Sequence, residues 1–456
     1  MHRRHARWWD SCPSIHAYDI GFYHRDRGGA GIFSLQRTRL DQGREDVTLR
    51  ALIASALNRA GECFVSTRAK YALTASAIFL MLFGANLPTP LYELYRALFG
   101  LSPFDVTIIY SVYALVVIIG LPVFGKVSDI YGRDLALLVG LSMALGGAII
   151  FSCAMNFPLL LMGRIVQGIG VGITSGAATA ALVELHPYHD RQKAALTATI
   201  ATVTGSAAGP LFGGALAEYS RSPERLPFIL YGLAILPILA GIARCERAPR
   251  MARVVAPQSS RMVSIDHRWP FLLACATAFM AFVVPAVFLS LGPSYLATLL
   301  DAHGPLIGGA VAFLLLGASA FAQITLRRLS PQAAMPLGVL LLAIGLSAFT
   351  FAWQSLPLTF MLIGTTLAGF GHGIAFTGSL AFVNTIAPME RRGFVTSILY
   401  VAIYAGGGIP ILALGFGASR FGIPIALEVY TSVVALACLT LSIMLVTIEG
   451  RKVSLP

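Results

Sequence analysis

The chain has 456 residues, of which 56% are hydrophobic and only 12% are charged, about half the charged share of a typical soluble domain. This composition excludes an ordinary soluble enzyme and a disordered chain, because so much apolar sequence cannot be covered by so few polar side chains. The formal net charge of +12 would suit nucleic-acid binding. However, the basic residues lie in the N-terminal region and in short loops beside apolar segments, a pattern that favours a membrane protein.

Residues 1–68 are polar and rich in arginine, and they contain no apolar run long enough for a signal peptide. We expect either a flexible basic extension on the cytoplasmic side or a chain start that lies upstream of the true one. Neither interpretation assigns a function to this segment.

Apolar runs alternate with short polar turns from Tyr71 onward. Each run is roughly 20 residues or longer, the length that an α-helix needs to cross a bilayer. The sequence therefore predicts an all-α integral membrane protein with twelve spans. The predicted spans cover residues 71–95, 104–125, 134–154, 157–185, 194–217, 226–244, 269–298, 304–325, 334–353, 356–386, 394–416 and 424–447.

Loop charges predict the orientation of these spans. Sixteen Lys or Arg residues lie at the even-numbered span ends, in the linker and in the C-terminal tail, against four on the opposite side. The positive-inside rule then predicts a multi-pass protein of the inner membrane with both termini in the cytoplasm.

The two sets of six spans repeat one another. The segment LLLMGRIVQGIGVGI from Leu159 aligns with FMLIGTTLAGFGHGI from Phe360 at an offset of 201 residues. A parallel repeat of six spans places a substrate site between the two halves near the middle of the membrane. The predicted parts are an N-terminal bundle over 69–244, a cytoplasmic linker over 245–268, a C-terminal bundle over 269–448 and a cytoplasmic tail over 449–456.

A charged turn, GKVSDIYGRD, separates the second and third spans. Gly125 and Gly132 allow tight turns and close helix approach, and Asp129 can accept hydrogen bonds from a helix N-terminus or pair with Arg133. The spacing G-x-V-S-D-x-x-G-R resembles the signature of the major facilitator superfamily. That resemblance implies a twelve-helix transporter in which these four residues form a cytoplasmic gate that locks the halves together when the protein faces outward.

The turn departs from that signature at two usually basic positions, which are Ile130 and Asp134 here. The gate is therefore expected to be weaker or differently paired. Alternatively, the charged turn serves only to set the membrane topology.

Span four contains an arginine, Arg164, about two helical turns inside its outer boundary. A buried guanidinium costs several kcal/mol, so it points to function and needs a partner. Gln167 lies three residues on and shares its helix face. The arrangement R-x-x-Q-G-x-G resembles the superfamily's fourth-helix motif, whose arginine is associated with proton coupling. Alternatively, Arg164 extends to the interface and anchors the outer end of the helix.

Span five contains GSAAGPLFGG, in which Gly205, Gly209 and Gly213 recur every four residues and form a smooth face for helix packing. Pro210 removes one backbone donor and is expected to kink the helix. Together with Gly214, the G-P-x-x-G-G core resembles the motif of drug:proton antiporters within the superfamily, which implies efflux. The alternative is generic small-residue packing.

Span one carries Asn86 followed by Pro88 and Pro90, which predicts an interrupted helix whose free carbonyl groups face a cavity. Many proton-coupled members of the superfamily carry a buried acid in this helix, whereas here no carboxylate falls at mid-membrane. His372 in span ten can titrate near neutral pH, or it is a core histidine bonded to a backbone carbonyl. The other candidates for a substrate or proton pathway, besides Arg164 and Gln167, are Tyr110, Tyr113, Tyr400 and Tyr404, which are alternatively interfacial anchors.

Motifs of catalysis, nucleotide binding and metal binding are missing: there is no G-x-S-x-G, H-E-x-x-H or Walker sequence, and the six cysteines form no C-x-x-C pair. We therefore expect no enzyme, no metal and no cofactor. The leading interpretation is a monomeric transporter in the lipid bilayer that exports a small organic or amphipathic compound in exchange for protons, with no nucleic-acid partner. The alternatives are proton-coupled uptake of a sugar, organic acid or other metabolite, and a transporter-like sensor that moves nothing.

Overall fold

The computed structural model describes residues 66–186, 190–245, 268–300, 304–352, 357–388 and 392–453, with the side chains at 122–131, 300 and 448–453 left aside. All of these residues belong to one compact unit that spans 63–456. The predicted N-terminal extension and linker lie almost wholly outside the described residues.

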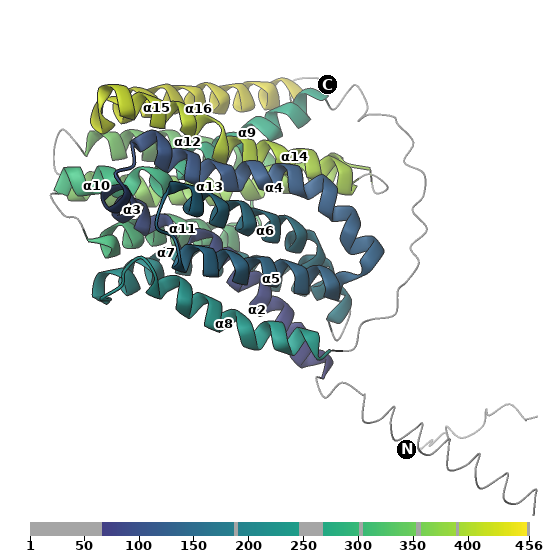
Figure 1. Cartoon of the computed structure of the whole chain (residues 1–456). Helices are drawn as coiled ribbons and strands as arrows, with labels where there is room; N and C mark the ends of the chain where they lie inside the picture. The colour runs from purple at the N-terminus through teal and green to yellow at the C-terminus, as the bar shows by residue number, and fades with distance from the viewer. Residues whose placement is uncertain are drawn as a thin grey trace, which may run out of the picture. The chain divides into compact units, whose positions relative to one another are not determined.

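The described residues form twelve helical segments that are long and apolar enough to cross a membrane, which confirms the predicted all-α membrane architecture (Figure 1). The helices pack against one another in one bundle. The elements are α2 (Thr67–Asn86), η1 (Thr89–Leu91), α3 (Tyr92–Phe99), α4 (Pro103–Tyr131), α5 (Arg133–Ser152), α6 (Phe157–Leu185), α7 (Arg191–Tyr219), α8 (Leu226–Ala243), α9 (Arg268–Ser290), α10 (Gly292–Leu300), α11 (Pro305–Thr325), α12 (Pro331–Phe351), α13 (Pro357–Ile386), α14 (Arg392–Gly408), α15 (Pro410–Phe421) and α16 (Ile423–Val453).

The helix starts follow from local sequence. The Ser66 side chain accepts a hydrogen bond from the Ala69 amide and begins α2, and Asn156 caps α6 in the same way through the Leu159 amide. At α7 the Asp190 carboxylate accepts hydrogen bonds from two backbone amides. Several other helices begin with proline, whose fixed φ and missing N–H suit the first turn.

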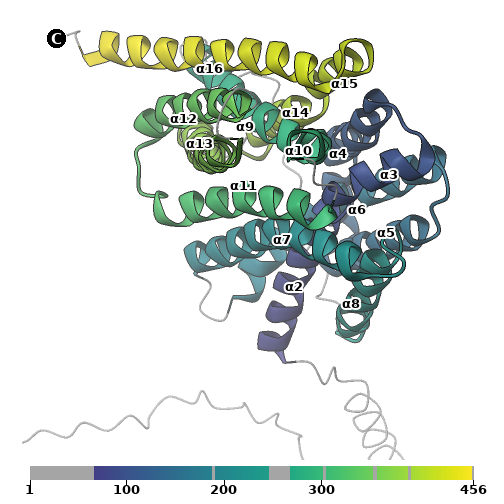
Figure 2. The same ribbon diagram turned by 90° about the vertical axis from the view of Figure 1, so that its left-hand side faces the viewer.

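The two halves repeat one another element by element. α2 begins at Thr67 and α9 at Arg268, while α7 begins at Arg191 and α14 at Arg392, so both pairs keep the offset of 201 residues. The fifth spans of the two halves differ: α7 runs through Pro210 without a break, whereas the equivalent segment breaks between α14 and α15. Figure 2 shows α7 of the first half lying beside α11 of the second.

The halves meet at the end of the bundle that carries α3 and α10, and we call this contact region the seam. The Glu93 carboxylate of α3 accepts a hydrogen bond from the Ser294 hydroxyl of α10. These two positions are themselves 201 residues apart, so equivalent residues of the two repeats touch each other. Two helix N-termini add contacts between the halves, from Phe104 N to Ser419 Oγ at 3.1 Å and from Leu306 N to Glu218 Oε2 at 3.4 Å.

Small residues on α7 set how closely the helices pack. A Cβ atom added at Gly205, Gly209 or Gly213 would come within 2.3–2.5 Å of a backbone carbonyl oxygen of the first span, so these glycines bring the backbones into direct contact. Gly214 faces the other half, where an added Cβ would lie 2.6 Å from the Pro305 carbonyl oxygen of α11. The G-P-x-x-G-G segment therefore joins three helices, α2, α7 and α11.

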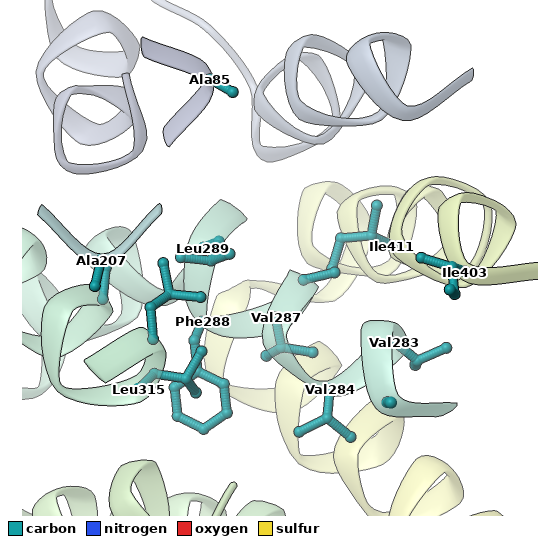
Figure 3. Packing of buried hydrophobic residues seen from close by; sticks show 14 of the residues in the cluster. Ala85, Ala207, Val283, Val284, Val287, Phe288, Leu289, Leu315, Ile403 and Ile411 are labelled. Carbon is teal, nitrogen blue, oxygen red and sulfur yellow. The ribbon is translucent and has the colours of Figure 1, made fainter. Parts of the chain in front are cut away.

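The apolar residues divide between an internal core and an outer surface. Figure 3 shows part of the core, where Val287 of α9 and Leu315 of α11 are fully buried. By contrast, Ile119, Trp269 and Leu436 are 68%, 75% and 66% exposed. Large apolar side chains that face outward are expected where the surrounding solvent is lipid.

The glycine contacts of α7 predict a difference between two Gly→Ala variants. Gly209→Ala should lower the thermal unfolding midpoint by several degrees, because its Cβ would lie 2.3 Å from the Phe83 carbonyl oxygen and must push α2 away. Gly176→Ala on α6 is the matched control, since an added Cβ meets nothing within 4 Å there. It should leave the midpoint unchanged or raise it slightly. Equal midpoints for the two detergent-solubilised variants would contradict the packing.

Candidate functional site

The site begins with the break between α2 and α3. Pro88 has no N–H, so the carbonyl of Gly84, four residues earlier, has no helical donor. α2 ends two residues later, at Asn86, whose side-chain amide donates a hydrogen bond to the Leu82 carbonyl at 3.0 Å. The predicted interruption of the first span is thus present, and its free carbonyls lie inside the N-terminal half.

Arg164 and Gln167 of α6 satisfy these carbonyls. Arg164 Nη1 donates to the Ala85 carbonyl at 2.7 Å and to Gln167 Oε1 at 3.2 Å. Gln167 Nε2 in turn donates to the Gly84 carbonyl at 3.2 Å. The Arg164 side chain is only 1% exposed, which excludes a side chain that extends to the membrane interface.

Tyrosines complete the surroundings of the guanidinium. Arg164 Nη2 donates to the hydroxyl of Tyr92 at the start of α3. The guanidinium carbon also lies 5.7 Å from the centre of the Tyr92 ring and 5.2 Å from that of Tyr113 on α4, within cation–π range. Tyr110 packs edge-on against Tyr92 with ring centres 6.5 Å apart.

The charge of this cluster is not balanced by an acid. Within the described part of the chain, the partners of Arg164 are a carbonyl, a hydroxyl, an amide and two aromatic rings, and none is a carboxylate. Its Nε–H is buried and has no acceptor. The cluster is therefore a buried cation whose Nε–H lacks an acceptor, and it can attract an acceptor-bearing or anionic group.

The C-terminal half carries a separate polar cluster around His372 of α13. Its Nδ1 lies 2.7 Å from the Ser319 hydroxyl of α11, so its partner is a side chain rather than the backbone carbonyl considered from the sequence. Tyr404 of α14 lies near Tyr400 of its own helix and near Tyr113 of the N-terminal half.

The predicted gate residues are only partly described. Gly125 and Asp129 lie on the last turns of α4, among the side chains left aside. Gly132 precedes α5 with φ +95°, a conformation that favours glycine. Arg133 Nε contacts Glu184 Oε1 of α6 at 3.4 Å. These contacts lie within the N-terminal half.

Asp134 stands where the family signature usually has a basic residue, and it pairs with Lys70 of α2 at 2.9 Å. Both side chains are almost buried. The acidic residue at this usually basic position is therefore paired with a basic side chain.

Sequence reasoning missed several residues of these clusters. Tyr92, Ser319 and Ser294 have no sequence motif, and each becomes significant only because another helix brings a partner to it. Glu93 lies in no sequence motif either, yet it bridges the halves. The 201-residue offset could have singled out Glu93 and Ser294, since equivalent residues can meet on the axis that relates two repeats. Among the described residues, no group of His, Cys, Asp and Glu could hold a metal ion.

The Arg164–Tyr92 contact can be tested by a double-mutant cycle. Tyr92→Phe should destabilise the protein by about 1–3 kcal/mol, because it removes an acceptor from a buried guanidinium. In an Arg164→Met background the same change should cost much less, giving a coupling energy well above zero. Tyr110→Phe is the control, since its neighbouring ring contributes packing without a hydrogen bond to Arg164. Equal costs for Tyr92→Phe in both backgrounds, measured by thermal unfolding, would refute the contact.

The chain is similar in sequence to known bacterial proteins. The quinolone resistance protein NorA of Staphylococcus aureus (strain MSSA476) is 27% identical over 225 residues, which covers 49% of this chain and 55% of NorA. The chain thus matches about half the length of that relative. The bacillibactin exporter of Bacillus subtilis (strain 168) is 26% identical over 403 residues, covering 83% of this chain and 96% of the exporter.

Solved structures share the fold at lower identity. A D-xylose–proton symporter superposes with a TM-score of 0.67 at 18% identity, covering 81% of this chain and 96% of that one. A bacterial homologue of the human lysosomal transporter Spinster gives 0.63 at 16% identity, covering 84% and 95%. The sequence pattern of the Major Facilitator Superfamily matches residues 74–410. With its twelve spans, internal repeat and charged turn, the chain belongs to the major facilitator superfamily of membrane transporters.

Proposed function

We propose that the protein is a secondary active transporter that exports a small organic or amphipathic compound in exchange for protons. It would act as a monomer in the inner membrane, with both termini in the cytoplasm. The observation that carries this proposal is the G-P-x-x-G-G segment of α7, which packs on α2 through Gly209 and on α11 through Gly214. The likeness to NorA and to the bacillibactin exporter supports the same direction of transport.

The seam supports alternating access. The contacts from Glu93 to Ser294 and from Phe104 to Ser419 join the halves at the α3–α10 end, which the loop charges predict to be outside. A conformation closed at this end faces inward, so export requires these contacts to break. In the opposite conformation the predicted gate at Asp129 and Arg133 would close the cytoplasmic end.

We assign proton exchange to two carboxylates of the seam, because opening the seam would change their surroundings. Glu93 accepts a hydrogen bond from Ser294 of the other half. It also accepts two hydrogen bonds from Arg96 of its own helix, at 2.7 and 2.8 Å. Glu218 accepts one from the Leu306 amide across the seam. Protonation would weaken acceptance at both positions and favour an open seam.

Uptake of an anionic metabolite is the second candidate. The observation in its favour is the buried Arg164 guanidinium, which has no carboxylate partner among the described residues and so could bind a carboxylate of the solute. A sensor without transport has less support, because a static receptor needs neither a seam nor a gate.

The function is tested with purified protein in liposomes that contain a pH-sensitive dye. A panel of a quinolone, ethidium, a sugar and an organic acid is added under an imposed proton gradient. Antiport predicts proton movement on addition of a lipophilic aromatic compound, loss of that movement in Arg164→Ala, and at least tenfold slower movement in Glu93→Gln. Glu428→Gln, an exposed carboxylate outside the seam, is the matched control and should behave as wild type.

Other results separate the remaining candidates. Proton movement in the same direction as an organic acid, abolished in Arg164→Ala, would replace export by uptake. A silent panel with correctly folded protein would contradict proton-coupled transport of all four compound classes. Wild-type rates in Glu93→Gln would contradict the role of the seam carboxylate.

A further inference from the structure

The His372 cluster of the C-terminal half contains a polar atom that the fold leaves unused. Its three polar members are Ser319 and Gln323 of α11 and His372 of α13, and they lie between α11 and α13. These helices pack very closely, because added Cβ atoms at Gly369 and Gly373 would each come within 2.4 Å of an α11 carbonyl oxygen. This close packing holds the His372 ring against Ser319.

The hydrogen bonds of the cluster favour one tautomer of His372. Gln323 Nε2 donates to Ser319 Oγ at 3.1 Å, so the serine oxygen already accepts one hydrogen bond. Its own hydroxyl hydrogen is then available for His372 Nδ1, 2.7 Å away. A neutral histidine that accepts at Nδ1 carries its hydrogen on Nε2.

The Nε2–H has no acceptor. His372 Nε2 is buried without a hydrogen-bond partner, although the whole side chain keeps 7% exposure. A buried unsatisfied donor destabilises the fold, and such atoms call for a ligand or another explanation. Gln323 is only partly buried, so the cluster reaches the accessible surface of this half.

Aromatic side chains surround the free donor. The Phe282 ring of α9 meets the imidazole edge to face, with ring centres 5.0 Å apart, and Phe376 lies parallel to it at 6.3 Å. His372 is sixteenth of the 30 residues of α13, which places it near the middle of the bilayer. The site therefore combines one N–H donor with apolar ring faces at mid-membrane depth.

We propose that His372 is a substrate-binding residue that donates its Nε2–H to an oxygen acceptor on an aromatic compound. Ser319 is the positioning residue that fixes the donating tautomer, and Phe282 and Phe376 supply the apolar walls. This inference rests on the proposed transport function and narrows its substrate class to planar aromatic compounds with a carbonyl or carboxylate oxygen.

The tautomer is tested without any substrate. Protein labelled with ¹⁵N at its nine histidines gives imidazole nitrogen signals by NMR, and the His372 signal is identified by its loss in His372→Phe. We expect the neutral Nε2–H form in the wild type and a mixture of tautomers in Ser319→Ala. A wild-type signal of the Nδ1–H form would overturn the proposal.

Substrate class is tested by binding to protein in lipid nanodiscs. The two probes are a quinolone, which carries a ketone and a carboxylate on a fused ring, and ethidium, a fused aromatic cation without oxygen. His372→Phe keeps the ring and removes the donor, so it should weaken quinolone binding about tenfold and ethidium binding less than twofold. Ser319→Ala, which keeps the histidine, should weaken quinolone binding about threefold.

Each other outcome has a definite meaning. An equal loss for both probes in His372→Phe would overturn the donor role and leave a packing role. Failure of the wild type to bind the quinolone would overturn the substrate class. Binding with the expected selectivity but no transport in liposomes would sink the proposed export function while the binding site stands.

Discussion

The break in the first span is the constraint on which the candidate site depends. Pro88 withholds a backbone donor from the Gly84 carbonyl, and water cannot supply one inside a membrane. Gln167 and Arg164 donate hydrogen bonds to the carbonyls of Gly84 and Ala85 instead. The free backbone acceptors of one helix thus stabilise the buried charge on another. Without the polar side chains of α6 the carbonyls would be buried and unsatisfied, and without the carbonyls the side chains would be. This mutual dependence explains why the carbonyls and the side chains lie at the same depth.

The internal repeat organises the fold, and the differences between its halves locate the chemistry. Equivalent residues, Glu93 and Ser294, meet in the seam, where one is an acid and the other a hydroxyl. The position equivalent to Arg164 is Thr365, which is buried with its hydroxyl unpartnered. The cation therefore belongs to one half alone, while the other half carries His372 about two helical turns further along α13. Duplication supplied the scaffold, and single substitutions made its two faces chemically distinct.

Much of the fold follows from the sequence because the bilayer imposes helix length, loop charge and backbone satisfaction. Span limits, the helix break at Asn86 and the shared face of Arg164 and Gln167 could all be predicted. Side-chain partners from distant helices could not: nothing local to Tyr92 or Ser319 indicates which residue will reach it. The position of Arg164 inside an apolar span indicated that it needed a partner, and only tertiary packing identified the carbonyl of Ala85.

The central claim is that the two halves move relative to each other and open the seam. Distances between paired spin labels test this motion most directly. Equivalent exposed positions give one pair at each end, Tyr219→Cys with Arg420→Cys at the α3–α10 end and Arg191→Cys with Arg392→Cys at the other, in a background without native cysteines. Measurements at acidic and alkaline pH, with and without the quinolone, should show one distance lengthening as the other shortens. Distributions that stay fixed, or change together at both ends, would contradict alternating access.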